Sequence, residues 1–359
     1  MQKEREIGID IIKCIAIFSV IGVHFILNTL SSINIKSSFD IMVLLSYRQF
    51  FIICVPLFLL TTGYLNIKKE PSIKYFKKIF FIVGVYLFYS ILTLFFRNTF
   101  MNESFSLSDG VRMIFSFEAI PYAWYINMFI KLSLIVPFLN RLIKVSSKKK
   151  LDWFLLFLIG VSVIPSTWNN FSSFFGYANV LRLPNFLNDL YPIAYYVIGG
   201  YIKLYLPVLE KKYYLLIGLA MYIFSIYVNF SYSSIGNISN AIKDYSSLFI
   251  LIQAYCVFMY LLDKKIKKLK SLNPLIIRIA SHTLDIYLIS YIVDNIVYKV
   301  FRRFFFSNTV ADYLYALLIV TIIFASSIMI VFFLNGLNKE IKKFLNVKSI
   351  FRITNRSKK

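Results

Sequence analysis

The sequence predicts an all-α, polytopic membrane protein with about 10 transmembrane helices and both termini in the cytoplasm. Three observations support this prediction. First, 58% of the 359 residues are hydrophobic, whereas a soluble domain contains about 45–50%. Second, the apolar residues form stretches of about 20, the length that crosses a bilayer as a helix. Third, the basic residues come in short runs between those stretches.

The expected spans follow one another without a visible internal repeat or a separate soluble domain. We expect one transmembrane domain over residues 1–338 and a basic cytoplasmic tail over residues 339–359 that lies on the inner membrane surface. The longer outer connections leave room for interfacial helices that line a cleft. The spans are predicted at residues 7–30, 42–66, 76–96, 122–142, 151–168, 188–208, 213–230, 246–262, 275–298 and 311–336.

The charge pattern predicts the orientation and excludes one class of partner. The formal net charge is +23, but short basic runs between apolar spans are typical of cytoplasmic loops. We therefore expect attraction to membrane lipids and no binding of nucleic acid. With both termini inside, the lysine-rich connections after the second, fourth, sixth and eighth spans are cytoplasmic. The one basic connection that then falls outside contains Lys299, Arg302 and Arg303.

The cysteines give no indication of a metal site. Cys14, Cys54 and Cys256 all lie inside apolar stretches, and their spacing matches neither a zinc motif nor a disulfide framework. We interpret them as small packing residues. No metal and no bound cofactor are expected.

The first span carries three polar residues on one helical face. An Asp or Lys inside a membrane span costs roughly 2.5 kcal/mol or more, so Asp10 and Lys13 require a partner or an aqueous cavity. On a helix, Lys13 and His24 differ by about 20° in direction and lie about 16 Å apart along the axis. Asp10 lies within about 60° of both. The stripe indicates a polar interior.

His24 is the candidate catalytic residue. It is one of two histidines in the chain, and imidazole ionises near neutrality, as general acid–base chemistry requires. The alternative is a buried structural histidine that is hydrogen-bonded to a Ser, Asn or Tyr.

Lysines near the inner surface are the candidate anion-binding group. Lys13 would anchor an anionic group that enters from the cytoplasm, and Lys74, Lys77 and Lys78 lie at a similar depth at the inner start of the third span. Lysine acts well as a point-charge partner of phosphate. The alternatives are snorkelling for Lys13 and ordinary positive-inside charges for the other three.

Lys131 and Arg48 are two further basic residues within spans, and both are assigned supporting roles. Lys131 lies in the middle of the fourth span and needs an acidic partner, for which Asp10, Asp285 and Asp294 are the candidates within spans. A structural ion pair is the favoured role. Arg48 lies near the outer start of the second span, where it could pair with a lipid headgroup or line a cleft.

These residues resemble acyltransferase family 3, integral membrane proteins that move an acyl group, usually acetyl, from cytoplasmic acyl-CoA to cell-surface polysaccharides, peptidoglycan or similar acceptors. The first span resembles the family's opening, with a leading Arg5, then Asp10, then Lys13 and His24 separated by ten residues. Further resemblances follow in order: VPLFLLTTGYL at 55–65, YAWYINMFIKLSLIVPFL at 122–139, YYVIGGYI at 195–202 and SHTLDIYLIS at 281–290.

Two departures from the family pattern bear on the site. The family's Arg-x-x-Arg pair at the inner start of the third span is Lys74-x-x-Lys77 here, which keeps the charge but loses the bidentate geometry. The histidine that often follows Ile-Tyr-Leu-Ile is Ser290 in this chain. His24 therefore remains the one intramembrane imidazole.

The resemblance implies an O-acyltransferase of the bacterial cytoplasmic membrane, with acyl-CoA, and foremost acetyl-CoA, as donor substrate. The implied acceptor is a cell-envelope polysaccharide or lipid-linked glycan. In the hypothesis that follows, Lys13, Lys74, Lys77 and Lys78 hold the CoA phosphates, and His24 acts as general base on the acceptor hydroxyl or is itself acylated. Asp10 would pair with Lys13 or Lys131. Ser, Asn or Tyr from neighbouring spans would stabilise the oxyanion.

Two other classes fit part of the pattern. A transporter or flippase for a lipid-linked oligosaccharide also uses polar residues within spans, but such proteins commonly show internal repeats or paired broken helices. A polysaccharide polymerase or sensor would be expected to carry a larger outer loop with arginine clusters.

Overall fold

Apolar helices make up the architecture, and several of them begin at a serine whose side chain caps the first turn: Ser37, Ser72, Ser106 and Ser147. The computed structural model describes residues 5–29, 37–174, 176, 181, 183–206, 209–235, 238, 242, 244–262, 272–304 and 315–356. The predicted lysine-rich loop at 264–270 and the side chains of the predicted tail lie outside the described residues. The elements are α1 (Ile7–Thr29), α2 (Ser38–Phe51), α3 (Cys54–Asn66), α4 (Ile73–Phe100), α5 (Leu107–Phe115), α6 (Trp124–Val145), α7 (Lys148–Ser162), α8 (Ile164–Phe174), α9 (Asn185–Asn188), α10 (Tyr191–Tyr205), α11 (Lys211–Ser231), α12 (Leu248–Leu262), α13 (Asn273–Ser281), α14 (Thr283–Phe304) and α16 (Ala316–Arg356).

The all-helical, multi-pass architecture predicted from the sequence is confirmed. Within the described residues, seven helical segments are long and apolar enough to cross a membrane, and α13 with α14 makes an eighth if the bent pair is one span. α10 and α12 have 15 residues each, which is shorter than a usual span. The predicted total of about ten spans and the cytoplasmic placement of both termini stay predictions.

Three of the predicted spans are each divided into two helices, and each division is local. The second span is divided at Ile52–Ile53 into α2 and α3, and α3 has Pro56 in its first turn, where the missing N–H costs little. The ninth is divided at His282 into α13 and α14, with a bend of 75°. The fifth is divided at Val163 into α7 and α8. None of these divisions was predicted, because the hydropathy continues across them.

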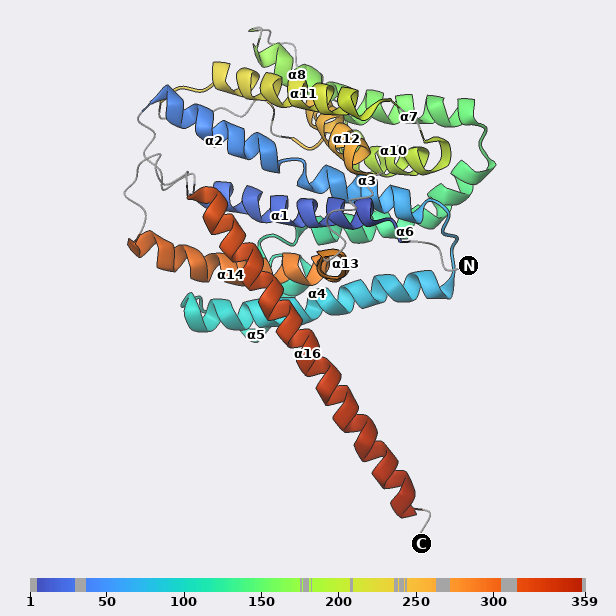
Figure 1. Cartoon of the computed structure of the whole chain (residues 1–359), viewed down its shortest axis with the longest axis vertical. Helices are drawn as coiled ribbons and strands as arrows, with labels where there is room; N and C mark the ends of the chain where they lie inside the picture. Colours follow the sequence, from blue (N-terminus) through green and yellow to red (C-terminus); the bar gives the residue numbers. More distant parts are fainter. Residues whose placement is uncertain are drawn as a thin grey trace.

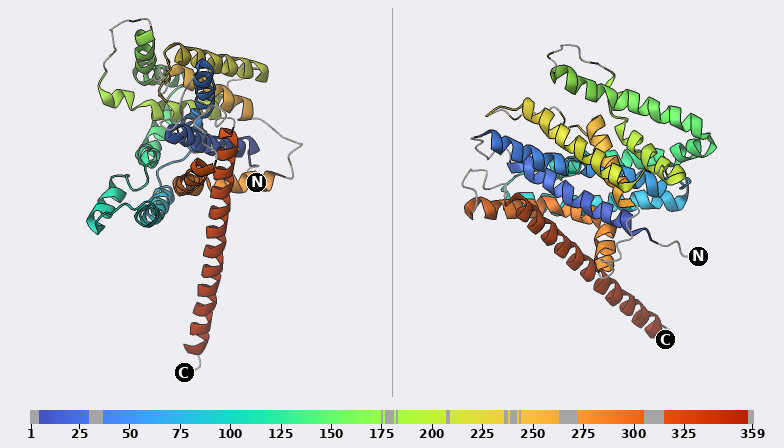
Figure 2. Two further views of the ribbon diagram at one scale, coloured as in Figure 1. Left: turned by 90° about the vertical axis from the view of Figure 1, so that its left-hand side faces the viewer. Right: turned by 45° about the horizontal axis from the view of Figure 1, so that its top comes forward.

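The first helix lies in the middle of the bundle. α1 packs against α2, α3, α12, α13, α14 and α16. α1, α2, α3, α6 and α11 run roughly side by side, with α4 and α5 on one side and α7 and α8 on the other (Figure 1). The additional views show the same layered arrangement (Figure 2). The polar stripe of α1 is thus placed inside the protein and away from lipid.

The contact between α3 and α10 depends on glycine. A Cβ added at Gly63 would overlap the carbonyl oxygen of Tyr196, and one at Gly199 would overlap that of Leu60. The two backbones therefore touch directly, as small residues allow in membrane helices. Both glycines belong to stretches that resemble the family pattern, and their role in this chain is packing.

The last helix extends far beyond the bundle. α16 is continuous from Ala316 to Arg356, and its C-terminal half projects away from the other helices (Figures 1 and 2). The predicted boundary at residue 338 lies within this helix.

Candidate functional site

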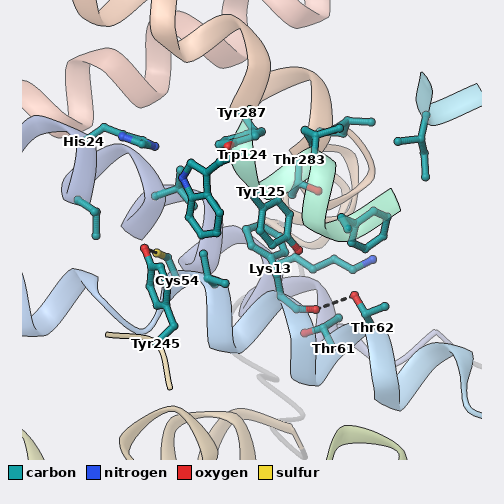
Figure 3. Close-up of a pocket in the computed structure, with 18 of the residues that line it drawn as sticks. Lys13, His24, Cys54, Thr61, Thr62, Trp124, Tyr125, Tyr245, Thr283 and Tyr287 are labelled. Atoms are coloured by element: carbon teal, nitrogen blue, oxygen red, sulfur yellow. Dashed lines mark hydrogen bonds between the residues drawn. The ribbon is translucent and has the colours of Figure 1, made fainter. Parts of the chain in front are cut away.

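A cavity runs along α1 from Lys13 to Leu27. It has a volume of about 340 Å³, and α1, α3, α4, α6 and α14 contribute to its walls. Lys13 and His24 both line it, and Figure 3 shows His24 at the left of the view and Lys13 near its centre. The shared helical face predicted for these two residues is thus the wall of one continuous space.

Positive charge gathers at the Lys13 end of the cavity. Lys69, in the loop between α3 and α4, lies close enough to Lys78 and Lys13 for their charges to act on it. Burial lowers the pKa of Lys69 below its ordinary value, and the neighbouring charges of Lys78 and Lys13 lower it further. The adjacent Glu70 does not neutralise this cluster, because its carboxylate binds Lys144 at 2.6 Å.

Lys69 was missed at the sequence level, and two predicted residues do not join the cluster. Lys69 looked like one more loop lysine, since no pattern links it to Lys13 across 56 positions. Lys74 and Lys77 are exposed in the first turns of α4, and no contact within the described part of the chain joins either to Lys13.

The predicted partner of Asp10 was wrong. Asp10 binds Arg5 through two hydrogen bonds, from Nε at 2.7 Å and from Nη2 at 2.9 Å, and not Lys13 or Lys131. Arg5 precedes the first turn of α1, so its side chain can fold back over the carboxylate, and the guanidinium fork matches both oxygens. The same guanidinium reaches Ser281 Oγ at 3.4 Å. Asp10 therefore helps fix the start of α1 to the end of α13.

The ion pair predicted for Lys131 is also absent from the described residues. Lys131 is exposed on α6, while the three candidate carboxylates contact Arg5, His282 and Tyr122 instead. Its exposure means that the long side chain can extend along the helix surface instead of requiring a buried partner.

The ring of Tyr122 packs face to face on His24. The ring centroids are 3.5 Å apart and the planes differ by 9°. Tyr122 Oη donates a hydrogen bond to Asp294 Oδ2 at 2.8 Å and accepts one from Asn28 Nδ2 at 2.5 Å. Tyr287 Oη donates to the backbone carbonyl of Tyr122. The platform beneath His24 is therefore held by side chains from α1 and α14.

His24 itself is oriented by packing. In the described residues neither ring nitrogen has a hydrogen-bond partner, and the imidazole is partly accessible because it opens onto the cavity. Figure 3 shows the ring extending from α1 toward Trp124. Both nitrogens are thus available to a substrate group, which the structural alternative of a histidine tied to Ser, Asn or Tyr does not provide.

Asp294 is fully buried and only half satisfied. Its Oδ1 has no hydrogen-bond partner among the described residues. A carboxyl group at membrane depth is costly and by default points to function. The sequence singled out Asp294 only as a possible partner of Lys131, since its contact with Tyr122 spans 172 positions.

Two adjacent threonines on the cavity wall differ in one respect. Thr62 Oγ1 donates to the backbone carbonyl of Phe58 at 2.7 Å, as Figure 3 shows. Thr61 Oγ1 is buried and has no partner among the described residues. An unpaired buried hydroxyl costs roughly 1–3 kcal/mol, and Thr61 belongs to the cavity lining, so it is a candidate to bind a substrate carbonyl or amide. The sequence did not single out Thr61, because nothing in the pattern distinguishes it from Thr62.

A smaller chamber adjoins the His24 end. Its volume is about 240 Å³, and Arg48 and Ile52 lie in its wall. Val23, Leu27, Trp124 and Tyr245 line both spaces. Arg48, predicted to line a cleft or meet a headgroup, thus lies beside the candidate site.

The described residues hold no cluster of three or more His, Cys, Asp or Glu side chains that could bind a metal ion. Cys14, Cys54 and Cys256 are free thiols in separate places, and Cys54 Sγ lies 3.9 Å from the hydroxyl of Tyr245. The cavity wall therefore consists of apolar and aromatic side chains with a few separate polar groups, as in many substrate pockets.

The described helices thus enclose a cavity lined by Lys13 and His24 within a bundle whose long helices are apolar enough to cross a membrane. The family model described as an acyltransferase domain matches residues 6–334, and the chain belongs to acyltransferase family 3. It is a membrane acyltransferase. Neither the search of curated proteins nor the search of solved structures gave a match.

Proposed function

We propose that this acyltransferase moves an acyl group, foremost acetyl, from cytoplasmic acyl-CoA to a hydroxyl of a cell-envelope polysaccharide or lipid-linked glycan. The membrane in question would be the bacterial cytoplasmic membrane. The observation that carries the proposal is the single cavity that connects Lys13 with His24. A donor bound at one end can reach a base at the other without leaving the protein.

The inner end suits the charged part of the donor. CoA carries phosphates, and Lys13, Lys69 and Lys78 are cations without a described carboxylate partner. The pantetheine arm would follow α1 and α3 toward His24. On this path it passes the unpaired hydroxyl of Thr61, which can bind one of its amide carbonyls.

His24 would supply the proton transfers at the outer end. A neutral imidazole nitrogen accepts the proton of the acceptor hydroxyl while the oxygen attacks the thioester carbonyl. The C–O bond forms, the C–S bond breaks, and the proton passes from the imidazolium to the leaving thiolate to give free CoA. The Tyr122 platform would hold the ring in place through both steps.

The experiment that tests this proposal follows the acyl group itself. Membranes that contain the chain are supplied with radiolabelled acetyl-CoA, and the surface glycan is isolated and examined for label and by mass spectrometry. The expected result is label in the glycan and a mass increase of one acetyl group per modified hydroxyl. Membranes without the chain provide the background.

The result that would contradict the proposal is unchanged glycan with acetyl-CoA and with succinyl-CoA alike. Movement of a lipid-linked oligosaccharide, labelled in its sugar, across the membrane with no acyl ester formed would instead support the flippase alternative.

A further inference from the structure

Arg48 lies in a span and faces the chamber next to His24. The chamber walls include Arg48, Ile52, Val23, Leu27, Trp124 and Tyr245. Val23 and Leu27 lie on either side of His24 along α1, and both also line the main cavity. A molecule that occupies both spaces would have one part at Arg48 and another at His24.

The guanidinium of Arg48 has no ion-pair partner among the described residues. No carboxylate of the described residues lies within 4 Å of it, and its side chain makes none of the described hydrogen bonds. Asp244 lies close enough to act on it electrostatically but forms no ion pair. A guanidinium has five donors in a rigid fork. Inside a membrane span such a group is retained at a cost, which indicates a function.

An aromatic wall formed by Trp124 and Tyr245 borders both the chamber and the main cavity. The rings of Trp124 and Tyr245 are stacked, with centroids 5.7 Å apart and planes within 21°. Cys54 Sγ lies 3.9 Å from the Tyr245 hydroxyl and Tyr195 donates a hydrogen bond to the Tyr245 carbonyl at 2.8 Å. The wall is therefore fixed, and its flat apolar face suits the ring of a sugar.

We propose that Arg48 binds an anionic group of the acceptor, a carboxylate or a phosphate attached to the sugar that presents its hydroxyl to His24. The proposal rests on the proposed function, because it names the class of acceptor for the same site. Both anions have paired oxygens that match the guanidinium fork. These oxygens can accept hydrogen bonds from the N–H groups of Arg48, which have no partner among the described residues.

Binding can be tested without any acyl transfer, because Trp124 lines the chamber. The full chain with Trp153→Phe and Trp168→Phe leaves Trp124 as the single tryptophan reporter in nanodiscs of zwitterionic lipid. Its fluorescence is titrated with methyl glucoside, methyl glucuronide and the 6-phosphate of methyl glucoside. These probes differ only in the group at carbon 6 of the sugar. Comparison of the carboxylate probe with the phosphate probe therefore shows which anion the site prefers.

We expect at least one anionic probe to bind about tenfold more tightly than the neutral one, as a charge-assisted hydrogen bond predicts. Arg48→Gln should remove that difference, and Arg48→Lys should keep part of it. Arg112→Gln is the matched control, since Arg112 lies on α5, is 74% exposed and pairs with Asp109. Size-exclusion profiles establish that each variant is folded.

Three outcomes would overturn the proposal: equal binding of the neutral and both anionic probes, unchanged binding in Arg48→Gln, or a signal that depends only on anionic phospholipid in the nanodisc. The proposed function fails separately. If the anionic probes bind through Arg48 but no acyl ester forms with acetyl-CoA or succinyl-CoA, the site binds anionic sugars and the transfer reaction is wrong.

Discussion

The two ends of the cavity are built in different ways. At the inner end, Lys13, Lys69 and Lys78 gather positive charge in partly or fully exposed positions, without a rigid frame. At the outer end, His24 packs on Tyr122, which buried hydrogen bonds hold in place. The inner end can attract a charged group by electrostatics, whereas the outer end fixes the position of one ring. Changes at the inner end should therefore act on KM, and changes at the outer end on kcat.

Loss of the imidazole should give the largest effect. His24→Ala is expected to lower kcat by about 10²- to 10⁴-fold, because the general base is removed while the donor site is intact. Single-turnover transfer from labelled acetyl-CoA in membranes measures it. His282→Gln is the control, since this other histidine lies at the α13–α14 junction, outside the cavity wall. Full transfer by a normally expressed His24→Ala variant would falsify the assignment.

Removal of the buried carboxyl should have the next largest effect. Asp294→Ala leaves the Tyr122 hydroxyl without its acceptor, and a lost buried partner costs about 1–3 kcal/mol, which corresponds to roughly 5- to 150-fold in kcat. The KM for acyl-CoA should stay unchanged. Asp294→Asn should restore most of the rate, because an amide oxygen still accepts the bond. A parallel rise in KM, or no rescue by Asn, would mean that Asp294 acts only on folding.

Substitutions at the inner end of the cavity should change KM for acyl-CoA rather than kcat. Lys13→Ala is expected to raise the KM for acyl-CoA by about tenfold with kcat nearly unchanged, as the loss of a charged contact predicts. Lys13→Arg should restore much of the affinity. Lys74→Ala and Lys77→Ala should change KM less, since both side chains are exposed. Equal effects at all three lysines would remove the distinction between a site residue and a surface charge.

Thr61 and Thr62, adjacent on the cavity wall, allow a matched comparison of an unpaired with a paired hydroxyl. Thr61→Val removes an unpaired hydroxyl and should weaken donor use by about fivefold, the value of one ordinary hydrogen bond. Thr62→Val removes a hydroxyl that is already bound to Phe58, so its effect on kcat/KM should be smaller. Steady-state kinetics on both variants decides the point, and the reverse order would show that Thr61 does not meet the substrate.

A pH profile should reveal the smallest effect. The pKa of Lys69 is lowered by burial and by Lys78 and Lys13, so Lys69 loses its proton at a lower pH than the ordinary value of about 10.4. Because the protonated form binds phosphate, the KM for acyl-CoA should rise severalfold with increasing pH, starting below that value. In Lys69→Arg the rise should move to higher pH, since arginine stays charged. Identical profiles for wild type and variant would exclude Lys69 from the donor site.

The sequence by itself determined the local features of this protein. Apolar stretches predicted the long helices, and helical periodicity placed Lys13 and His24 on one face, which the structure turns into one wall of the cavity. These features follow from hydropathy and from the fixed rotation per residue, and both are readable within about twenty positions. The motif around Gly63 was equally visible, although its role in close packing with α10 was not.

The tertiary structure alone decided which side chains meet. Tyr122 lies 94 positions from Asn28 and 172 from Asp294. Lys69 lies near enough to Lys13 for their charges to interact, from a loop that has the pattern of ordinary positive-inside charge. Asp10 binds Arg5 because the residue before the helix folds back over the helix start. Periodicity within the helix cannot predict such a contact. Such contacts depend on how several similar helices pack together, and many packings satisfy the same hydropathy pattern.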